Sequence, residues 1–497
     1  MCMRKLIITW LILSLCFPVS QAQVKLPDLG NPSDAVMSED DEARYREKVR
    51  QQMYQYQMIM TDPVVASYIY HLGYRLAAYS NKPSQTFDFF VVPADVINAS
   101  AYPGGLIVIY SGLFLETASE SELAGVMAHE IAHVTQRHIS RMIAKQQKAT
   151  LPIMLGMLAA AAAASAGSSG DAPIAIAASM SGLQQQLAIN FTRYHEYEAD
   201  RVGIQTLYDA DLNPEGMAGF FAKLMQKNRV DPRYELPEYL RTHPLSVNRV
   251  TEAKNRSKNF VVKPYVESPM YDFVKERLRV MTADEFDGLD DYYRSPKDES
   301  ASAAFLYGRA LQQYYKNDFK ASLKTLQAIE TDAETVVLVE ILQAYNLNRI
   351  DKEQGQASIN KLLRKYPENS VVLEETARIF MKSDDLKDFD RAIVNLRKLA
   401  YKEPKNPHYQ DLLSIAYYNA MKPTAAGQAM AKRSHLLGQN YQAVRTLKNL
   451  RKDKNLDYYE AAKIDAQVNE YELLITDEER EFERQQDRHG RHLGIME

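Results

Sequence analysis

One short segment of this chain holds three side chains that can carry out metal chemistry together. It consists of His129-Glu130-Ile131-Ala132-His133. Residues four apart lie on the same face of a helix, so both imidazoles can reach one ion. Glu130 lies one position further round, where it can act on a water molecule without binding the metal. The pattern is typical of a zinc peptidase in which Glu130 is the general base.

A catalytic zinc ion needs a third protein ligand and an open position. No second histidine motif follows closely, so a carboxylate is expected, and the best candidate is Glu196. Asp200 lies four residues after Glu196 and should share its helix face, where it can accept a hydrogen bond from a ligand imidazole. Glu198 lies about 200° round the helix from Glu196 and is expected to be solvated.

The other histidines near these motifs are weaker candidates. His138 lies nine residues after His129, on nearly the opposite face of a continuous helix, so a surface position is expected. His195 should point about 100° away from Glu196. The sequence leaves His243 open between a site role and a surface role. Cys2 and Cys16 both lie in the N-terminal segment, so a processed chain would have only nitrogen and oxygen ligands.

The elements that must position these residues follow from the periodicity of the apolar residues. Two strands are expected, with a turn at Pro103-Gly104-Gly105 between them. A long helix should begin at a serine cap and carry the histidine motif. The expected helices span 40–80, 120–149, 187–207 and 214–227, and the expected strands span 87–92 and 105–110.

The N-terminal segment, residues 1–22, has the pattern of a signal peptide. Arg4 and Lys5 precede an apolar run, and Ser20-Gln21-Ala22 fits a cleavage site. An uncleaved anchor is the alternative, and a lipoprotein signal through Cys16 fits less well because Leu15 precedes it. Residues 23–39 should form an extended leader.

Residues 151–182 form an apolar, alanine-rich stretch that breaks in its middle. The 14 residues from Leu151 to Ala164 are too few to span a bilayer as a helix. A buried or interfacial helical hairpin is favoured, and peripheral contact with a membrane is the alternative.

The C-terminal half has few strand signals. Pro367-Glu368-Asn369 and Pro404-Lys405-Asn406 recur 37 residues apart, each after an apolar-periodic helix. This favours tetratricopeptide-like repeats over residues 266–480, before a charged tail at 481–497; a generic helical domain is the alternative. The fold class is α+β, mainly helical. A zincin-type peptidase domain with a small sheet (40–265) precedes an all-α solenoid. The net charge of −4 over 497 residues gives no nucleic-acid footprint.

Taken together, the motifs resemble those of the HtpX- and Oma-type zinc metallopeptidases, the group that includes the CAAX prenyl proteases. Four elements over about residues 40–255 carry the resemblance: Asn98-Ala99 with Pro103-Gly104-Gly105, the HEIAH motif, Glu196 with Asp200, and His243-Pro244 with Arg249.

The resemblance implies one zinc ion bound by His129, His133 and Glu196, with Glu130 as the base and Asp200 behind the ligands. It makes His243 a possible fourth ligand that holds the enzyme latent, or a group that stabilises the oxyanion. Arg249 would stabilise the oxyanion or orient the substrate. The strand at 105–110 would be the edge that pairs with substrate backbone.

With its export signal and helical repeats, the chain is most similar to the exported members of this family that act in outer-membrane protein assembly. This implies a periplasmic endopeptidase, in solution or at the outer membrane, which degrades misfolded or stalled β-barrel proteins and assists their assembly. Its partners would be those proteins and, through the repeats, the assembly machinery. The alternative function is a chaperone or assembly scaffold with a latent or rarely active protease site.

Overall fold

A computed structural model describes residues 36–144, 193–230, 237–261, 263–294, 301–477 and 479–481. The expected signal peptide, most of the leader, the apolar stretch at 151–182 and all but the first residue of the tail lie outside the described residues. Among the helices that are described, none is both long and apolar enough to cross a membrane.

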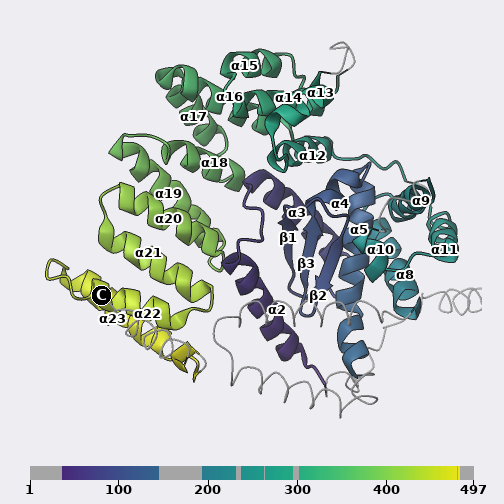
Figure 1. Cartoon of the computed structure of the whole chain (residues 1–497), viewed down its shortest axis with the longest axis horizontal. Coiled ribbons are helices and arrows are strands. Elements are labelled where there is room, and N and C mark those ends of the chain that lie inside the picture. Colours follow the sequence, from purple (N-terminus) through teal and green to yellow (C-terminus); the bar gives the residue numbers. More distant parts are fainter. Residues whose placement is uncertain are drawn as a thin grey trace, which may run out of the picture.

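The first half of the described chain places a three-stranded sheet among helices (Figure 1). Its elements are α2 (Glu39–Gln55), α3 (Pro63–Ala78), β1 (Asp88–Val92), β2 (Ala99–Tyr102), β3 (Leu106–Tyr110), α4 (Ser111–Glu116), α5 (Glu120–Thr135), α8 (Arg193–Asp209), α9 (Glu215–Val230), α10 (Glu238–Thr242) and α11 (Val247–Ser257).

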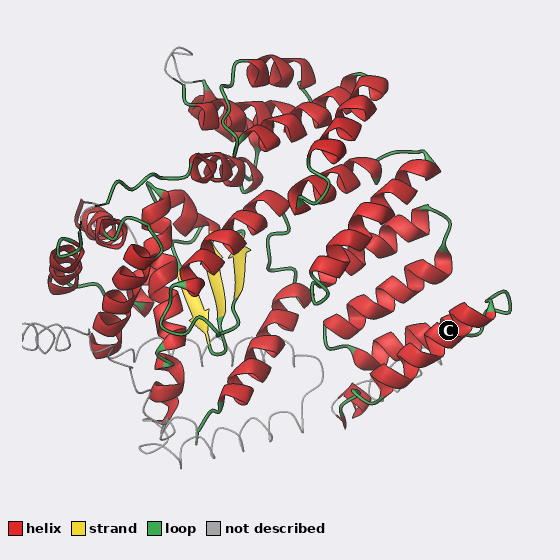
Figure 2. Cartoon of the chain, turned by 180° about the vertical axis from the view of Figure 1, so that it is seen from behind, coloured by secondary structure: helices red, strands yellow, loops and turns green. Residues whose placement is uncertain are grey.

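The second half is helical throughout its described residues, as expected (Figure 2). Consecutive helices from α14 onward pack side by side. The elements are α12 (Pro269–Met281), the short 3-10 helix η1 (Phe286–Leu289), α13 (Asp290–Tyr293), α14 (Ala303–Tyr315), α15 (Phe319–Gln327), α16 (Val336–Ile350), α17 (Lys352–Lys365), α18 (Ser370–Phe380), α19 (Leu386–Lys402), α20 (Pro407–Asn419), α21 (Pro423–Leu436), α22 (Asn440–Leu450) and α23 (Tyr458–Glu472).

The sheet order corrects one expectation about the substrate edge. The strands lie in the order β1-β3-β2, with β1 parallel and β2 antiparallel to β3. The expected edge strand, β3, is therefore the central strand and is paired on both sides. The strand that the sequence analysis did not predict, β2, is the edge that packs against α5. Its turn into β3 needs glycine, because Gly104 and Gly105 have φ angles of 84° and 100°.

Two expected helices are interrupted. The pattern over 40–80 forms two helices, and the second begins where Asp62 accepts hydrogen bonds from Val64 and Val65 and Pro63 takes the first position. The expected helix over 120–149 begins as predicted, with Ser119 accepting from the Glu122 amide. It ends at Thr135, however, and the chain is helical again only from residue 138. Arg137 in the break has a φ of 53°.

The helix that carries the histidine motif is enclosed on several sides. It packs against α8, α9, α3 and β2. The closest approach to α8 is possible because Gly203 has no side chain: a Cβ there would lie 3.1 Å from the His129 backbone nitrogen. This short separation lets side chains on α8 reach those on α5.

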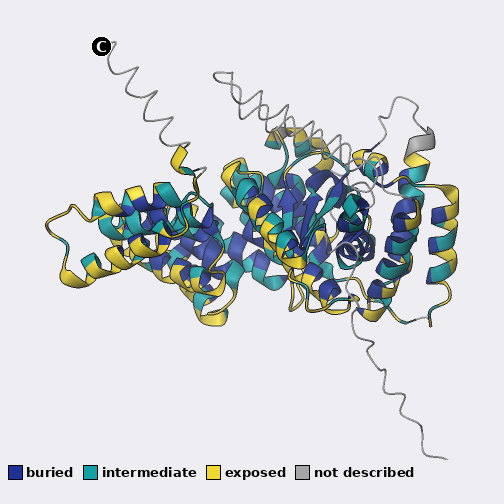
Figure 3. Ribbon diagram, turned by 90° about the horizontal axis from the view of Figure 1, so that it is seen from below, coloured by how far each residue is buried: buried dark blue, intermediate teal, exposed yellow. Residues whose placement is uncertain are grey.

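The largest hydrophobic core joins the first half of the molecule to the first helices of the second half. Its buried residues extend along the chain from Met60 to Leu342 and include side chains of α3, α5, α9, α12, α14 and α16. The residues of this core are among those coloured dark blue as buried in Figure 3. The core therefore crosses the predicted domain boundary at residue 265.

Candidate metal centre

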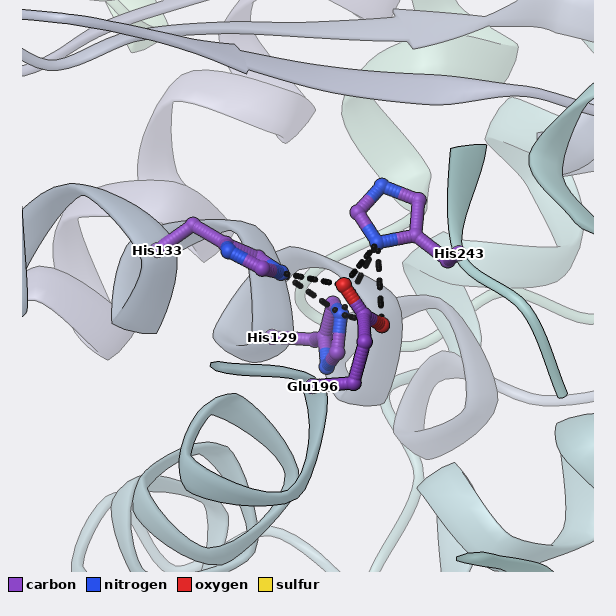
Figure 4. Close-up of side chains that lie close together, drawn as sticks. All are labelled: His129, His133, Glu196 and His243. Atoms are coloured by element: carbon purple, nitrogen blue, oxygen red, sulfur yellow. Dashed lines mark hydrogen bonds and ion pairs between the residues drawn. The ribbon is translucent and has the colours of Figure 1, made fainter. Parts of the chain in front are cut away.

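Four side chains from three separate parts of the chain converge at one point (Figure 4). His129 and His133 project from α5, Glu196 from α8, and His243 from the end of α10. One ligand atom from each lies within 4.8 Å of the others, and all four residues are buried. The structure thus brings the three ligands that the sequence analysis expected together with His243.

The spacing of these atoms fits a tetrahedral metal site. A metal–ligand distance of about 2.0–2.1 Å gives a tetrahedron with edges of about 3.4 Å. The His129 Nε2 atom lies 3.0 Å from His133 Nε2, 3.3 Å from His243 Nδ1 and 3.5 Å from Glu196 Oε2. Glu196 Oε1 lies 3.6 Å from His133 Nε2 and 3.2 Å from His243 Nδ1. Zinc commonly accepts this donor set of imidazole nitrogens and one carboxylate.

The charges around the point also favour a cation. The carboxylates of Glu130, Glu196 and Asp200 are all buried, and among the described residues Arg249 contacts two of them. Before any imidazole is protonated, three carboxylates and one guanidinium leave an excess of two negative charges, which favours a bound cation. Burial lowers the pKa of His129, but the hydrogen bonds and charges of Asp200 and Glu196 outweigh this effect and raise it to about 9.

Glu130 lies beside the ligands without joining them. Within the part of the chain that the structure describes, its Oε1 atom has no hydrogen-bond partner, and it lies 3.5 Å from His243 Nε2. Burial raises the pKa of Glu130, and the charges of His243 and His129 together with a backbone hydrogen bond from Ala101 only partly offset this rise. A carboxylate with a raised pKa at this position is suited to accept a proton near neutral pH.

Asp200 and Arg249 form a brace behind the site. Asp200 Oδ1 lies 3.0 Å from His129 Nδ1, which turns Nε2 of that ring toward the other ligands. Arg249 donates to both oxygens of Asp200 at 2.8 Å, lies 2.9 Å from Glu196 Oε2 and donates to the Pro244 carbonyl. These contacts place Arg249 behind the ligands, and its expected role at an oxyanion stays a prediction.

His243 is held in place by the turn that follows α10. Its backbone amide donates to the Tyr239 carbonyl at 2.8 Å, and the two rings stack with centroids 4.8 Å apart. Tyr239 is anchored in turn, because its amide donates to the carbonyl of Ile97, just before β2. The sequence contained no signal for Tyr239, since the contact depends on the fold of the loop.

Three residues that were expected outside the site belong to it. His138 is fully buried, and its Nδ1 atom lies 2.8 Å from His133 Nδ1. The break after α5 brings His138 next to His133 instead of across the helix. His195 is also buried and stacks on His138, with centroids 4.6 Å apart. Glu198, which was expected to be solvated, is 19% exposed at its side chain and contacts His138 Nε2 at 3.0 Å and Arg141 at 2.9 Å.

Burial sets the protonation of the two neighbouring rings. It lowers the pKa of His133 well below its usual value, and the charge of His129 adds to this effect. Burial likewise lowers the pKa of His138 to about 4, against the opposing hydrogen bond to Glu198. Both rings are therefore neutral near pH 7.

Comparisons with known proteins agree with this geometry. Residues 63–257 match the model of peptidase family M48. The beta-barrel assembly-enhancing protease of Yersinia pestis is 31% identical over 459 residues, which are 91% of this chain and 93% of that protein. Its counterpart in Escherichia coli (strain K12) is 30% identical over 463 residues, 90% and 91% of the two chains. The mitochondrial metalloendopeptidase OMA1 of Arabidopsis thaliana is 29% identical over 174 residues, which are 35% of this chain and 32% of that protein. With a histidine and glutamate cluster inside the matched region and relatives that extend over nine-tenths of its length, this chain belongs to peptidase family M48 and is a metallopeptidase.

Proposed function

We propose that this metallopeptidase is a periplasmic zinc endopeptidase that degrades misfolded or stalled outer-membrane β-barrel proteins and assists their assembly. The convergence of four buried ligand atoms supports the chemistry. The similarity over nine-tenths of the chain to proteins named beta-barrel assembly-enhancing protease supports the class of client. The signal-peptide pattern of residues 1–22 supports the compartment.

His129, His133 and Glu196 would hold the zinc ion in this proposal. A bound zinc ion would polarise the peptide carbonyl and make water a stronger acid. Glu130 would take the proton from the attacking water and pass it to the leaving amine. Asp200 and Arg249 would keep His129 and Glu196 in position, because Asp200 contacts the ring of His129 and Arg249 contacts the carboxylate of Glu196.

His243 would act as a gate. Its Nδ1 atom takes the fourth corner of the ligand cluster, and its Nε2 atom lies 3.5 Å from the proposed base Glu130. In this arrangement the ring fills the place that the reacting water needs. Movement of the loop after α10 would open the position, and the histidine could then stabilise the oxyanion instead.

The alternative function is an assembly scaffold whose protease is rarely active. The fourth-corner position of His243 and the series of packed helices from α14 to α23 favour it. We propose that residues 266–480 are tetratricopeptide-like repeats that bind the assembly machinery, and that residues 40–265 form the peptidase part. The shared core means that this boundary would separate functions rather than folding units. Peripheral membrane contact through residues 151–182 stays a prediction.

The chemistry can be tested with three variants and a metal assay. His129→Ala should lose zinc, because it removes one ligand, whereas Glu130→Gln should retain zinc and lose cleavage of an unfolded protein. His71→Ala is the matched control, since His71 is exposed on α3, and it should retain both properties. Cleavage by Glu130→Gln at the wild-type rate would refute the role of Glu130.

The client class can be tested by trapping. Glu130→Gln would bind clients without cutting them, so it should retain β-barrel outer-membrane proteins after crosslinking in cells. His129→Ala with the same tag measures the binding that does not need the metal site. Enrichment of unfolded proteins of every class would instead indicate general degradation and contradict the proposed client.

A further inference from the structure

The two histidines of the metal motif contact different kinds of side chain through their Nδ1 atoms. His129 faces a carboxylate, since its Nδ1 lies 3.0 Å from Asp200. His133 faces a third histidine, since its Nδ1 lies 2.8 Å from Nδ1 of His138. Two ring nitrogens at this distance form a hydrogen bond only when one carries the proton and the other offers its lone pair. The direction of that bond decides which nitrogen of His133 can bind a metal.

The outer neighbours of His138 determine the direction. The Nε2 atom of His138 lies 3.0 Å from Glu198 Oε2, and an ionised carboxylate can only accept. Arg141 lies 2.9 Å from the same oxygen and favours the ionised form. A neutral His138 ring must therefore carry its proton on Nε2, which leaves a lone pair on Nδ1. His133 must then donate from its own Nδ1, which leaves the lone pair of its Nε2 atom directed at the ligand cluster.

We propose that His138 is a positioning residue for the metal centre. It accepts a hydrogen bond from the Nδ1–H group of His133 and so fixes the tautomer of His133 that binds the metal. The inference rests on the proposed zinc site and adds to it a residue that the sequence placed on the surface. The hydrogen-bonded series His133, His138, Glu198 and Arg141 is the counterpart of His129, Asp200 and Arg249 on the other side of the cluster.

The break after α5 makes the contact possible. Arg137 adopts a left-handed conformation, φ 53°, which costs a residue other than glycine about 1–2 kcal/mol. Its side chain is held by Glu42 at 2.9 Å and by the Met37 carbonyl at 2.6 Å, so α2 and the residue before its cap stabilise the turn. His195 stacks on the His138 ring from α8 and limits its rotation. In a continuous helix His138 would lie on nearly the opposite face from His129 and could not contact His133 in this way.

Two substitutions at residue 138 test the proposal. His138→Phe retains a planar ring but offers no acceptor. His138→Asn places its side-chain oxygen near the position of the histidine Nδ1 and can still accept from His133. We expect His138→Phe to raise the zinc dissociation constant about 10- to 100-fold, and His138→Asn to return it to within about threefold of wild type. The measurement is competition for zinc between metal-stripped protein and a chromogenic chelator.

The melting temperature of each metal-free variant separates positioning from packing. The proposal predicts similar metal-free melting temperatures for the two variants and different zinc affinities. Equal zinc affinity of His138→Phe and wild type, or equal weakening by both variants, would overturn it. If His138→Phe does not fold, Glu198→Ala tests the same hydrogen-bonded series from its outer end and should weaken zinc binding about 3- to 10-fold. Unchanged affinity there would also overturn the proposal. A wild-type protein that binds no zinc would refute the proposed site itself.

Discussion

Arg277 on α12 is predicted to be a large single contributor to stability, because it joins three distant helices. It donates from Nε to both oxygens of Asp62, at 2.8 and 2.9 Å, and from Nη2 to Glu375 on α18. A further bond from Nη1 reaches the Tyr307 hydroxyl at 3.0 Å. Arg277, Asp62 and Glu375 are all buried. Removal of the arginine would leave two buried carboxylates near each other without the guanidinium that contacts both, and only the more distant charge of Arg378 would act on them.

We expect Arg277→Met to lower the free energy of unfolding by about 3–5 kcal/mol, the cost of removing one partner of a buried ion pair. The matched control is Arg279→Met on the same helix. Arg279 is 25% exposed at its side chain and pairs with Glu276 at 3.4 Å. That substitution should cost about 1 kcal/mol or less. The free energy of unfolding is measured from the first transition in urea, which is monitored by circular dichroism.

The pH dependence gives a second, independent test. Burial raises the pKa of Asp62, but the charge and hydrogen bonds of Arg277 outweigh it and hold the pKa below the usual 3.8. The wild-type pair therefore stabilises the fold above pH 3.8, and this contribution is lost as the pH falls through the folded pKa. Burial already raises the pKa of Glu375 in the wild type, although the charge of Arg277 opposes it. Without Arg277 the pKa of both carboxyl groups should rise, so that they bind protons at a higher pH than in the wild type.

The loss of unfolding free energy in Arg277→Met relative to wild type should consequently be largest at pH 8 and smaller at pH 5. A loss no greater than that of Arg279→Met, or one that does not change with pH, would contradict the role of Arg277 as the cation that stabilises both carboxylates. Either result would mean that water or a rearranged side chain compensates the two carboxylates.

Four further outcomes are expected. His243→Ala should increase cleavage of unfolded substrate, because it empties the fourth corner; unchanged or lost activity would mean that His243 is no gate. Asp200→Asn should raise the zinc dissociation constant about tenfold in chelator competition by weakening the hold on His129 and Arg249, and wild-type affinity would contradict that role. Gly203→Ala should lower the free energy of unfolding by about 1–3 kcal/mol in urea by pushing α8 from α5. Gly219→Ala is the control, because a Cβ there meets only Glu122 Oε1 at 3.5 Å, and it should leave the free energy of unfolding unchanged. Equal losses of stability in the two variants would count against the close approach of α8 to α5. Treatment with a chelator should lower the melting temperature of wild type and leave that of His129→Ala unchanged, since only the wild type would have a bound metal ion to lose.

The sequence predicted the parts of the site that depend on helix periodicity alone. His129 and His133 on α5, and Glu196 and Asp200 on α8, are pairs four residues apart, and each pair lies on one helix face as expected. A resemblance to a known family brought His243 into the site, because no local pattern links residue 243 to α5.

The predictions that failed depend on contacts between residues far apart in the chain. His138 was placed on the opposite face because the helix was assumed to be continuous, and the left-handed Arg137 that breaks it is stabilised by Glu42, 95 positions earlier in the chain. The order of the strands depends on which strands pair, and periodicity does not give pairing. The break before α3, in contrast, could have been predicted from Asp62-Pro63, a cap followed by a residue suited to the first helical position.

The shared core also limits how this protein can be recombined. The family model ends at residue 257, but Tyr271 of α12 stacks on Phe114 of α4 and donates to the Thr117 carbonyl. A peptidase fragment cut at the family boundary would expose that aromatic surface to water. A chimera between relatives would therefore have to join the chains after α16, where the largest core ends, and exchange only the helices beyond it.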